Sequence, residues 1–221
     1  SDRERAAVVA TVVGRVGRRV KVVVGTSADG VRRCIELSRE AKAQGASAIM
    51  VSPPRLSRVN SEAVISHYKA VAEAVDLPIV VQDYPPACGF AMEAGLLVRI
   101  AREVPAARTV KLEDPPTPFK IARILAAAGE TRLSVIGGLG GVYLLEELLA
   151  GASGVMTGFG FPEGPVRICR HFRGGRIDEA AELFYRLVPL MRFECQEGIG
   201  MAIRLRRMGI HIEEKNVFTC A

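Results

Sequence analysis

A lysine lies in the middle of a short apolar segment, residues 109–114, which reads Thr-Val-Lys-Leu-Glu-Asp. Side chains alternate across a β-strand, so Val110 and Leu112 point to one face and Lys111 points to the other, together with Glu113. An ammonium group that is buried in a protein either pairs with an opposite charge or loses its proton. A neutral lysine amine is a nucleophile, and its usual covalent product with a carbonyl compound is a Schiff base.

The same lysine has a second interpretation, in which it is salt-bridged to Glu113 or to a residue on a neighbouring strand. Structural ion pairs of this kind perturb buried charges as functional sites do. The segment by itself is compatible with both interpretations, so the rest of the chain has to decide.

The composition is that of an ordinary globular protein, with 221 residues of which 49% are hydrophobic and 24% are charged. This length can bury one good core, and one domain is the default. We expect no membrane partner, because no apolar run approaches the roughly 20 residues of a membrane span and the chain begins with no signal-peptide pattern. Five scattered cysteines without a Cys-x-x-Cys motif favour reduced thiols and a cytoplasmic location.

The net charge of +6 comes mainly from arginines that are spread along expected helices. Because no basic run is interleaved with aromatic residues, we expect no nucleic-acid binding, although a mildly positive field would help to collect an anionic substrate. The three histidines, His67, His171 and His211, lie far apart in the sequence. They lack the spacing of metal ligands, so we expect no metal site and no cofactor.

Six strand-like segments alternate with amphipathic helical segments. The expected strands are residues 20–24, 46–51, 78–84, 109–114, 133–136 and 154–158. The expected helices are residues 3–17, 29–43, 61–75, 92–103, 119–128 and 143–150, followed by 166–172, 177–193 and 199–208. This is the period of βαβ units, and apolar strands without strict polar alternation indicate a parallel sheet that is covered on both faces.

Each expected strand ends in glycine, proline or a polar residue, as in Gly25-Thr26, Ser52-Pro53, Asp83-Tyr84, Glu113-Asp114, Gly137-Gly138 and Thr157-Gly158. The carboxyl ends of the strands carry the site in open α/β sheets and in (β/α) barrels alike. Thr26 and Thr157 are therefore candidates for binding a substrate. The glycine-rich segment 137–141 is a weak candidate for a phosphate cradle; a tight turn and a close approach of the backbone to a small substrate are the alternatives.

Taken together, the sequence resembles the dihydrodipicolinate synthase / N-acetylneuraminate lyase family of class I aldolases and lyases. The resemblance is carried by Val24-Gly25-Thr26, Val51-Ser52-Pro53-Pro54, residues 77–89 (LPIVVQDYPPACG), Val110-Lys111 and residues 151–156 (GASGVM). It implies a TIM (β/α)8-type barrel, here with only six βα units, followed by C-terminal helices. It also implies a Schiff base between Lys111 and a 2-oxo acid, and a homo-oligomer, either a tetramer or a dimer. We accordingly expect an N-terminally truncated barrel over residues 1–162 and a helical segment packed on it over residues 163–221.

The sequence departs from the family pattern in several places. The first two βα units are absent, with the Gly-x-x-Gly-Glu turn and the paired Thr/Ser that hold the substrate carboxylate. The family's proton-relaying tyrosine falls on Gln82, and Tyr84, two residues further, shares the inward face of that strand. The arginine that meets the second substrate in dihydrodipicolinate synthases falls on Ala87. These differences argue against true dihydrodipicolinate synthase activity.

The segments around Gln82, Lys111 and Gly137 are more similar to the branch of 2-keto-3-deoxy sugar-acid dehydratases and aldolases. The implied catalytic residues are Lys111 as the Schiff-base lysine and Tyr84 as a proton relay, with a packed or rim tyrosine as the alternative for Tyr84. The substrate would be a small-molecule 2-oxo acid such as pyruvate or a 2-keto-3-deoxy sugar acid. Its candidate binding residues are Thr26, Gln82, Glu113, Gly138, Gly140 and Thr157.

Two other functions remain open on the sequence alone. The missing carboxylate turn and the altered tyrosine and arginine positions suit a non-catalytic relative that acts as a structural or ligand-sensing protein. An unrelated flavodoxin-like binding module would also give alternating strands and helices.

Overall fold

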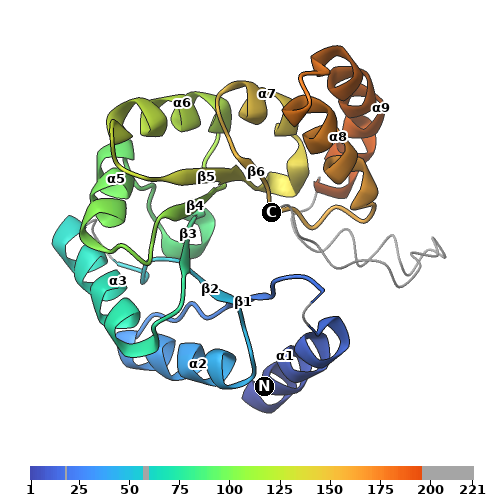
Figure 1. The fold of residues 1–221 in the computed structure, drawn as a ribbon. Coiled ribbons are helices and arrows are strands. Elements are labelled where there is room, and N and C mark those ends of the chain that lie inside the picture. Colours follow the sequence, from blue (N-terminus) through green and yellow to red (C-terminus); the bar gives the residue numbers. More distant parts are fainter. Residues whose placement is uncertain (18, 57–59, 196–221) are drawn as a thin grey trace. The chain divides into compact units, whose positions relative to one another are not determined.

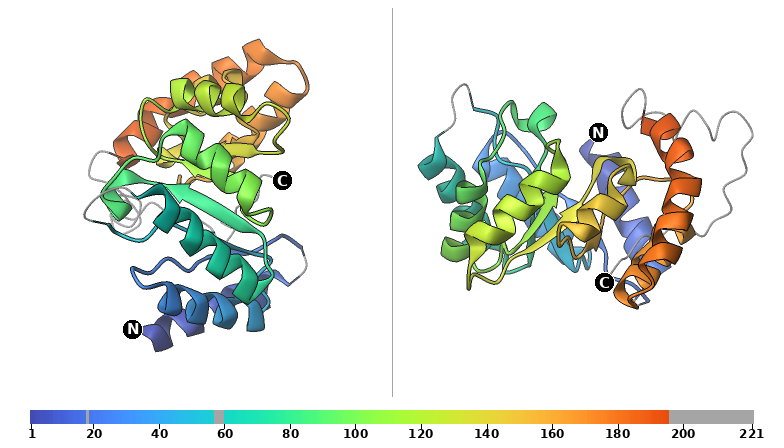
Figure 2. Two further views of the ribbon diagram at one scale, coloured as in Figure 1. Left: turned by 90° about the vertical axis from the view of Figure 1, so that its left-hand side faces the viewer. Right: turned by 90° about the horizontal axis from the view of Figure 1, so that it is seen from above.

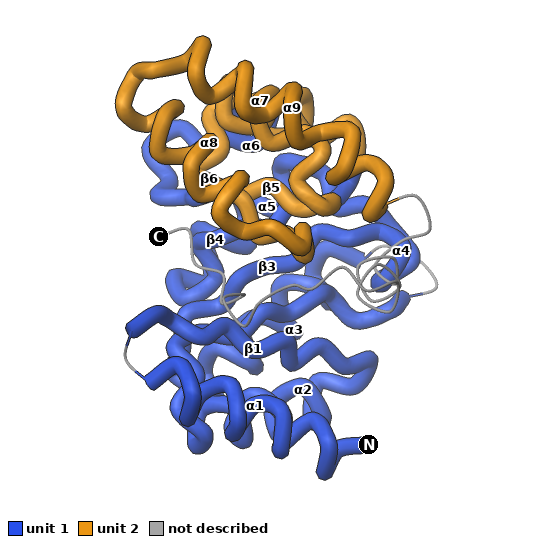
Figure 3. Tube along the Cα trace, turned by 90° about the vertical axis from the view of Figure 1, so that its right-hand side faces the viewer, with its two compact units in different colours: residues 1–114, 123–134 blue, residues 115–122, 135–221 orange. Residues whose placement is uncertain are grey.

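The computed structural model describes residues 1–17, 19–56 and 60–195. These residues belong to two compact units, one formed by residues 1–114 and 123–134 and the other by residues 115–122 and 135–221 (Figure 3). The predicted boundary after residue 162 stays a prediction. The helix expected over residues 199–208 lies outside the described residues.

The first unit contains four parallel strands in sequence order. They are β1 (Val23–Gly25), β2 (Ala48–Val51), β3 (Ile79–Asp83) and β4 (Thr109–Leu112), and each pairs with the next. Its helices are α1 (Asp2–Val16), α2 (Val31–Ala43), α3 (Ser61–Val75), the short α4 (Pro85–Cys88) and α5 (Ala94–Glu103). Parallel neighbours require a crossover connection, and α2, α3 and α5 provide these crossovers.

One face of these four strands carries the core of the first unit. Figure 1 shows α2, α3 and α5 along one side of the strands, and the left view of Figure 2 shows these helices from their outer side. The side chains turned to that side are fully or almost fully buried: Val24, Ile49, Val51, Ile79, Val81, Val110 and Leu112. On the opposite face Met50 and Lys111 are partly buried, whereas Val80 is buried. The expectation that both faces of the strands are covered stays a prediction for this second face.

The second unit contains β5 (Ser134–Gly137) and β6 (Gly154–Val155), which are parallel to each other. A 3₁₀ turn (Leu139–Gly141), α7 (Leu144–Leu149), α8 (Glu163–Arg173) and α9 (Ile177–Cys195) complete it. Helices α8 and α9 form a hairpin (Figure 1). Its inner side shares one apolar core with α7 and β6, which includes Leu144, Val155, Phe159, Ile168, Phe184 and Met191. Helix α6 (Thr117–Ala128) contributes residues to both units.

The α/β class and the parallel strands are confirmed, and the architecture is consistent with part of a TIM-barrel-like fold. The six strands found among the described residues do not amount to a complete eight-stranded barrel. Most expected elements agree with the structure to within a few residues. Expected strand 20–24 is shifted, because the ladder begins only at Val23, opposite Ala48.

Helix α3 shows how local sequence sets the bounds of an element. Asn60 is its N-cap and its side-chain oxygen accepts a hydrogen bond from the Ala63 backbone N–H, at 3.1 Å. The helix ends at Asp76, whose backbone is left-handed, and the Lys42 amine of α2 donates to the Val75 carbonyl at 2.7 Å. These contacts fix the helix that covers the middle of the first unit.

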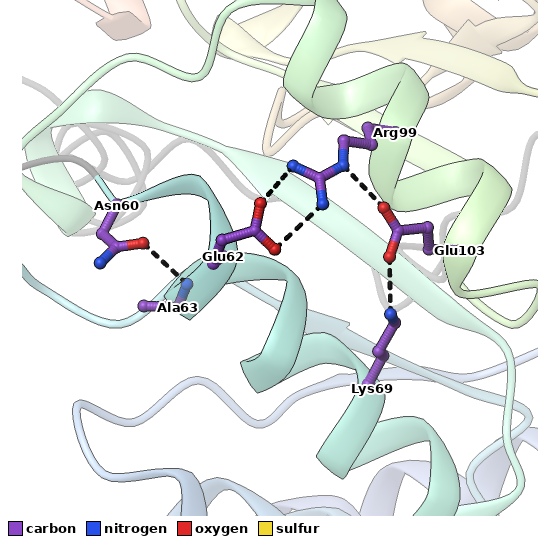
Figure 4. Close-up of polar contacts among 6 residues, drawn as sticks. All are labelled: Asn60, Glu62, Ala63, Lys69, Arg99 and Glu103. Atoms are coloured by element: carbon purple, nitrogen blue, oxygen red, sulfur yellow. Dashed lines mark hydrogen bonds and ion pairs between the residues drawn. The ribbon is translucent and has the colours of Figure 1, made fainter.

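An ion-pair network joins α3 to α5 on the outer surface of the first unit (Figure 4). The Arg99 guanidinium donates to both oxygens of Glu62, at 2.6 and 3.0 Å, and to Glu103 at 2.7 Å. Lys69 reaches the other oxygen of Glu103 at 2.6 Å. The two carboxylates raise the pKa of Arg99, so the guanidinium stays charged at any pH of interest.

We predict a small, salt-dependent loss of stability on substituting Arg99→Met, since this network is exposed and surface pairs are weak and screened. The melting temperature should fall at low ionic strength, and the difference from the wild type should shrink toward zero in 1 M salt, where the Debye length is about 3 Å. Arg186→Met, which breaks a single pair with Glu182, is the matched control and should have a smaller effect. A loss that does not depend on salt would contradict this account.

His67 is a buried histidine on α3. It packs edge-on against the Tyr68 ring with 5.6 Å between ring centroids, and its Nε2 atom has no hydrogen-bond partner among the described residues. Burial lowers the pKa of His67 from 6.5 to about 4. The folded state therefore favours the neutral imidazole, while the unfolded state binds a proton below pH 6.5.

We predict that His67 makes the protein less stable as the pH falls from 6.5 to 4. In this window the unfolded state holds more protons than the folded state, so the free energy of unfolding decreases by up to about 3 kcal/mol. Denaturant unfolding at several pH values should show this decrease in the wild type and in His171→Leu, and His67→Leu should lack most of it. An unchanged pH dependence in His67→Leu would refute the prediction.

Candidate active site

Lys111 lies on the face of β4 opposite to the helices. Its strand neighbours Val110 and Leu112 are completely buried against the helical layer, and alternation turns Lys111 the other way. The Lys111 side chain is only 12% exposed. The amine is therefore neither under the helices nor free in bulk solvent.

Glu113 pairs with Lys111, with 3.1 Å between Nζ of the lysine and Oε1 of the glutamate. The Glu113 side chain is 9% exposed. Its backbone N–H donates to the Asp83 carbonyl at 2.9 Å, which continues the pairing of the strands one residue beyond β4. This hydrogen bond fixes the backbone from which the Glu113 side chain extends. Of the two interpretations that the sequence left open, the structure contains the ion-pair geometry, and this geometry is compatible with catalysis because Glu113 can accept the proton of the amine.

Gln82 lies directly beside Lys111 on β3, since the two residues are Cα partners in the parallel register. Its side-chain Nε2 donates to Glu113 Oε2 at 2.6 Å. Its Oε1 accepts a hydrogen bond from the Ser52 hydroxyl, at 3.0 Å. Ser52 in turn donates its backbone N–H to the Ser27 hydroxyl at 2.8 Å. A chain of hydrogen bonds thus crosses the carboxyl ends of four neighbouring strands and ends at the lysine amine.

The other candidates of the first unit lie outside this chain of contacts. Thr26 is completely buried, and its hydroxyl accepts a hydrogen bond from Ser38 of α2, at 2.8 Å. Tyr84 follows β3 and is the N-cap of α4, with a partly buried side chain. The hydrogen bonds described for the first unit do not join its hydroxyl to Lys111 or Glu113. The roles of Thr26 and Tyr84 stay predictions.

The second unit holds the remaining candidates, Gly138, Gly140 and Thr157. The glycine-rich segment forms a 3₁₀ turn in which the Gly141 N–H donates to the Gly138 carbonyl at 2.8 Å. Gly140 has a positive φ of 68°, and a Cβ atom built there would lie 2.0 Å from the Cys195 sulfur of α9. The tight turn, which was one of the alternatives drawn from the sequence, is thus present. At Gly140 both the positive φ and the nearby Cys195 sulfur disfavour a residue with a Cβ atom.

The loop after β6 lies next to this turn. A Cβ atom on Gly141 would stand 3.6 Å from the Thr157 hydroxyl oxygen, which accepts a hydrogen bond from the Phe159 N–H at 3.1 Å. The carboxylate of Glu194 on α9 accepts a hydrogen bond from the Gly160 N–H, also at 3.1 Å. The last turn of α9 therefore contacts both loops that carry candidate binding residues.

Sequence reasoning missed Glu147, a fully buried carboxylate on α7. Thr117 donates its hydroxyl to Glu147 Oε1 at 2.6 Å, and a Cβ atom on Gly137 would fall 1.7 Å from Oε2. Glu147 thus ties the segment that follows β4 to the end of β5. The available signal was a glutamate at an apolar helical position, within Leu-Leu-Glu-Glu-Leu-Leu.

Within residues 1–17, 19–56 and 60–195, no group of three or more His, Cys, Asp or Glu side chains is arranged to hold a metal ion. In the same part of the chain, none of the helices is both long and apolar enough to cross a membrane.

A parallel α/β protein with an enclosed lysine beside a carboxylate at the carboxyl end of a strand has the features of a Schiff-base aldolase or lyase. The chain belongs to the Dihydrodipicolinate synthetase family, whose profile matches residues 1–216. This confirms the resemblance that was drawn from the sequence.

Three similar proteins illustrate the range of the family. L-2-keto-3-deoxyarabonate dehydratase of Azospirillum brasilense is 35% identical over 213 residues, which are 95% of this chain and 69% of that protein. A 4-hydroxy-tetrahydrodipicolinate synthase of Methanothrix thermoacetophila is 31% identical over 175 residues, which are 78% of this chain and 58% of that protein. The crystal structure of dihydrodipicolinate synthase from Rhodopseudomonas palustris superposes with a TM-score of 0.85 at 28% identity, covering 100% of this chain and 76% of that one.

Other relatives carry the names of lyases and of 4-hydroxy-2-oxoglutarate aldolases. The relatives support a lyase, and they give no support to the non-catalytic alternative. They also differ in the reaction that their names state, so the family alone does not specify the substrate of this chain.

We predict that Gly137→Ala destabilises the second unit, because the new methyl group must displace the buried Glu147 carboxylate. Overpacking of this kind costs about 1–3 kcal/mol. Chemical denaturation should show the loss, and Gly137→Ala should cost much less in a Glu147→Ala background, where the colliding atoms are gone. Gly95→Ala is the control, since a Cβ atom there meets nothing within 4 Å. Equal costs of Gly137→Ala in both backgrounds would contradict the contact.

Proposed function

We propose that this chain is a Schiff-base-forming lyase in which Lys111 condenses with the C2 carbonyl of a 2-oxo acid. The observation that carries the proposal is the position of the Lys111 amine. It lies on the face of β4 that is turned away from the helices, is largely shielded from solvent, and contacts a carboxylate that can take up its proton. The protonated imine draws electrons from C3, so a C3–H bond or a C3–C4 bond can break. Loss of a hydroxyl from C4 then gives dehydration, and cleavage of C3–C4 gives an aldol cleavage.

A 2-keto-3-deoxy sugar acid is the substrate class that we favour over pyruvate with a second aldehyde partner. The relative at 35% identity is named for the dehydration of such an acid. Ala87 in place of an arginine, as the resemblance aligns the chains, removes a group for a second carboxylate substrate. The net charge of +6 favours the collection of an anionic substrate.

Further roles follow from the same proposal. Backbone N–H groups around Gly138 and Gly140, with the Thr157 hydroxyl, are our candidates for binding the substrate carboxylate. Tyr84 is our candidate for passing a proton to the leaving oxygen. The TIM (β/α)8-type barrel with six βα units and self-association into a dimer or tetramer stay predictions, and the superposition with a dihydrodipicolinate synthase supports the barrel.

Borohydride trapping tests the Schiff base directly. Incubation with pyruvate and borohydride should add one reduced pyruvyl group to the intact protein, and peptide mapping should place it on Lys111. Lys111→Met should give no adduct and should lower turnover on the order of 10³-fold or more, since the covalent route is lost. Lys69→Met, which removes a lysine from the surface of α3, should react like the wild type.

The reaction type needs a second measurement, on L-2-keto-3-deoxyarabonate. A dehydratase converts this acid to a product with the carbon chain intact, whereas an aldolase releases pyruvate. Mass spectrometry of the products separates the two outcomes. Failure of the wild type to form any adduct with either acid would refute the proposed function.

A further inference from the structure

Glu113 holds two different partners on its two carboxylate oxygens. Oε1 lies 3.1 Å from Lys111 Nζ, and Oε2 accepts the 2.6 Å hydrogen bond from Gln82. The carboxylate is thus directed at the amine from one side and anchored from the other. Under the proposed function, on which this inference rests, the arrangement places a carboxylate beside the imine once it has formed.

In the imine, the lysine nitrogen is bonded to C2 of the substrate, and C3 is the next atom along the chain. Two bonds separate Nζ from C3, a distance of about 2.5 Å for ordinary bond lengths and angles. A carboxylate oxygen 3.1 Å from Nζ therefore lies at most about 5.6 Å from C3, and closer where the substrate lies on the carboxylate side of the amine. A general base has to lie within direct reach of the proton that it removes, or within reach through one water, and this range of distances allows both for Glu113.

We propose that Glu113 is the catalytic base that removes the proton from C3 of the Lys111 imine. The C3–H electron pair moves into the C2–C3 bond, the C2=N electrons move to nitrogen, and the proton goes to the Glu113 carboxylate. The products of the step are a neutral enamine and a carboxylic acid. In the reverse direction the acid returns its proton to C3, so no oxidant, reductant or further reactant is needed.

The neighbouring polar groups are less suited to this step. Asp83 is completely buried on the helix-covered side of β3, opposite to Lys111. The amide of Gln82 does not titrate, so it cannot accept a proton as a tyrosine phenolate would. Glu113 is therefore the carboxylate in contact with Lys111 among the described residues of the first unit.

Gln82 and Ser52 act as positioning residues for this base. Both ends of the Gln82 amide are engaged, because Nε2 donates to Glu113 and Oε1 accepts from Ser52. The Ser52 backbone is itself fixed by its 2.8 Å hydrogen bond to the Ser27 hydroxyl. The chain of contacts holds the carboxylate in a fixed position, which matters because a misplacement of about 1 Å can cost roughly 10²-fold in rate.

Hydrogen–deuterium exchange at C3 of pyruvate isolates the proposed step. In D₂O, reversible enamine formation replaces the methyl protons by deuterium, and ¹H NMR follows the loss of their signal. We expect the wild type to catalyse exchange and Glu113→Gln to exchange about 10²–10⁴-fold more slowly, the usual range for the loss of a general base. Glu113→Gln should still be trapped on Lys111 by borohydride. Glu182→Gln, an exposed carboxylate on α9, is the matched control.

Two further variants keep the proposal testable if Glu113→Gln is poorly folded. Glu113→Asp retains a carboxylate and should keep part of the exchange rate. Glu113→Ala should regain exchange when formate is added, because a free carboxylate can occupy the vacated space. Gln82→Leu should slow exchange less than Glu113→Gln does, and formate should not restore it.

The outcomes separate the two proposals. A wild type that forms no borohydride adduct contradicts the proposed function. A wild type that forms the adduct, together with a Glu113→Gln variant that exchanges C3 protons at the wild-type rate, overturns the role of Glu113 alone. Glu113→Ala that forms no adduct and is not rescued by formate also overturns it, since the residue would then be structural.

Discussion

The site depends on the register of β3 against β4. Val81 is opposite Val110 and Asp83 is opposite Leu112, so the buried side chains of both strands face the helices together. Gln82 and Lys111 are then forced onto the other face side by side. Because the side-chain period of a strand is two, a slip by one residue would place the lysine under the helical layer and its apolar neighbours in the open. Burial of the apolar residues thus determines where the amine lies.

The Lys111–Glu113 pair has to satisfy two opposing demands. A partly buried ion pair stabilises the ammonium, so the folded state does not bear the cost of a buried charge without a partner. The Schiff-base reaction that we propose requires the neutral amine, which forms only when the proton leaves. A carboxylate in direct contact reconciles the two, because the pair can pass a proton internally without creating a separated charge in a poorly hydrated place. The anchoring of the second oxygen by Gln82 keeps the carboxylate next to the amine in both states.

The strands, the helices and the face occupied by Lys111 could be predicted from the sequence, because they follow from local periodicity. Helix α3 was expected with its observed bounds. The contact of Gln82 with Glu113 could not be predicted, since it depends on a register between residues 31 positions apart. The orientation of Thr26 toward Ser38 could not be predicted either, because a hydroxyl at the end of a strand can face either a substrate or the core under the helices. Short elements such as α4 carry too few residues to produce a periodic signal.

The most informative difference from the family pattern is a residue that cannot titrate. Where the resemblance places a proton-relaying tyrosine, this chain has Gln82, whose amide can orient a neighbour without exchanging protons. If Lys111 acts as we propose, the proton chemistry must then be carried by another group, and the strand itself supplies one two residues after the lysine. Glu113 shares the face of Lys111 because of the same alternation that turns the amine away from the helices. A single period-two pattern in β4 and the residue after it thus places the proposed nucleophile and the proposed base on one face, and Gln82 of the neighbouring strand holds the carboxylate in place.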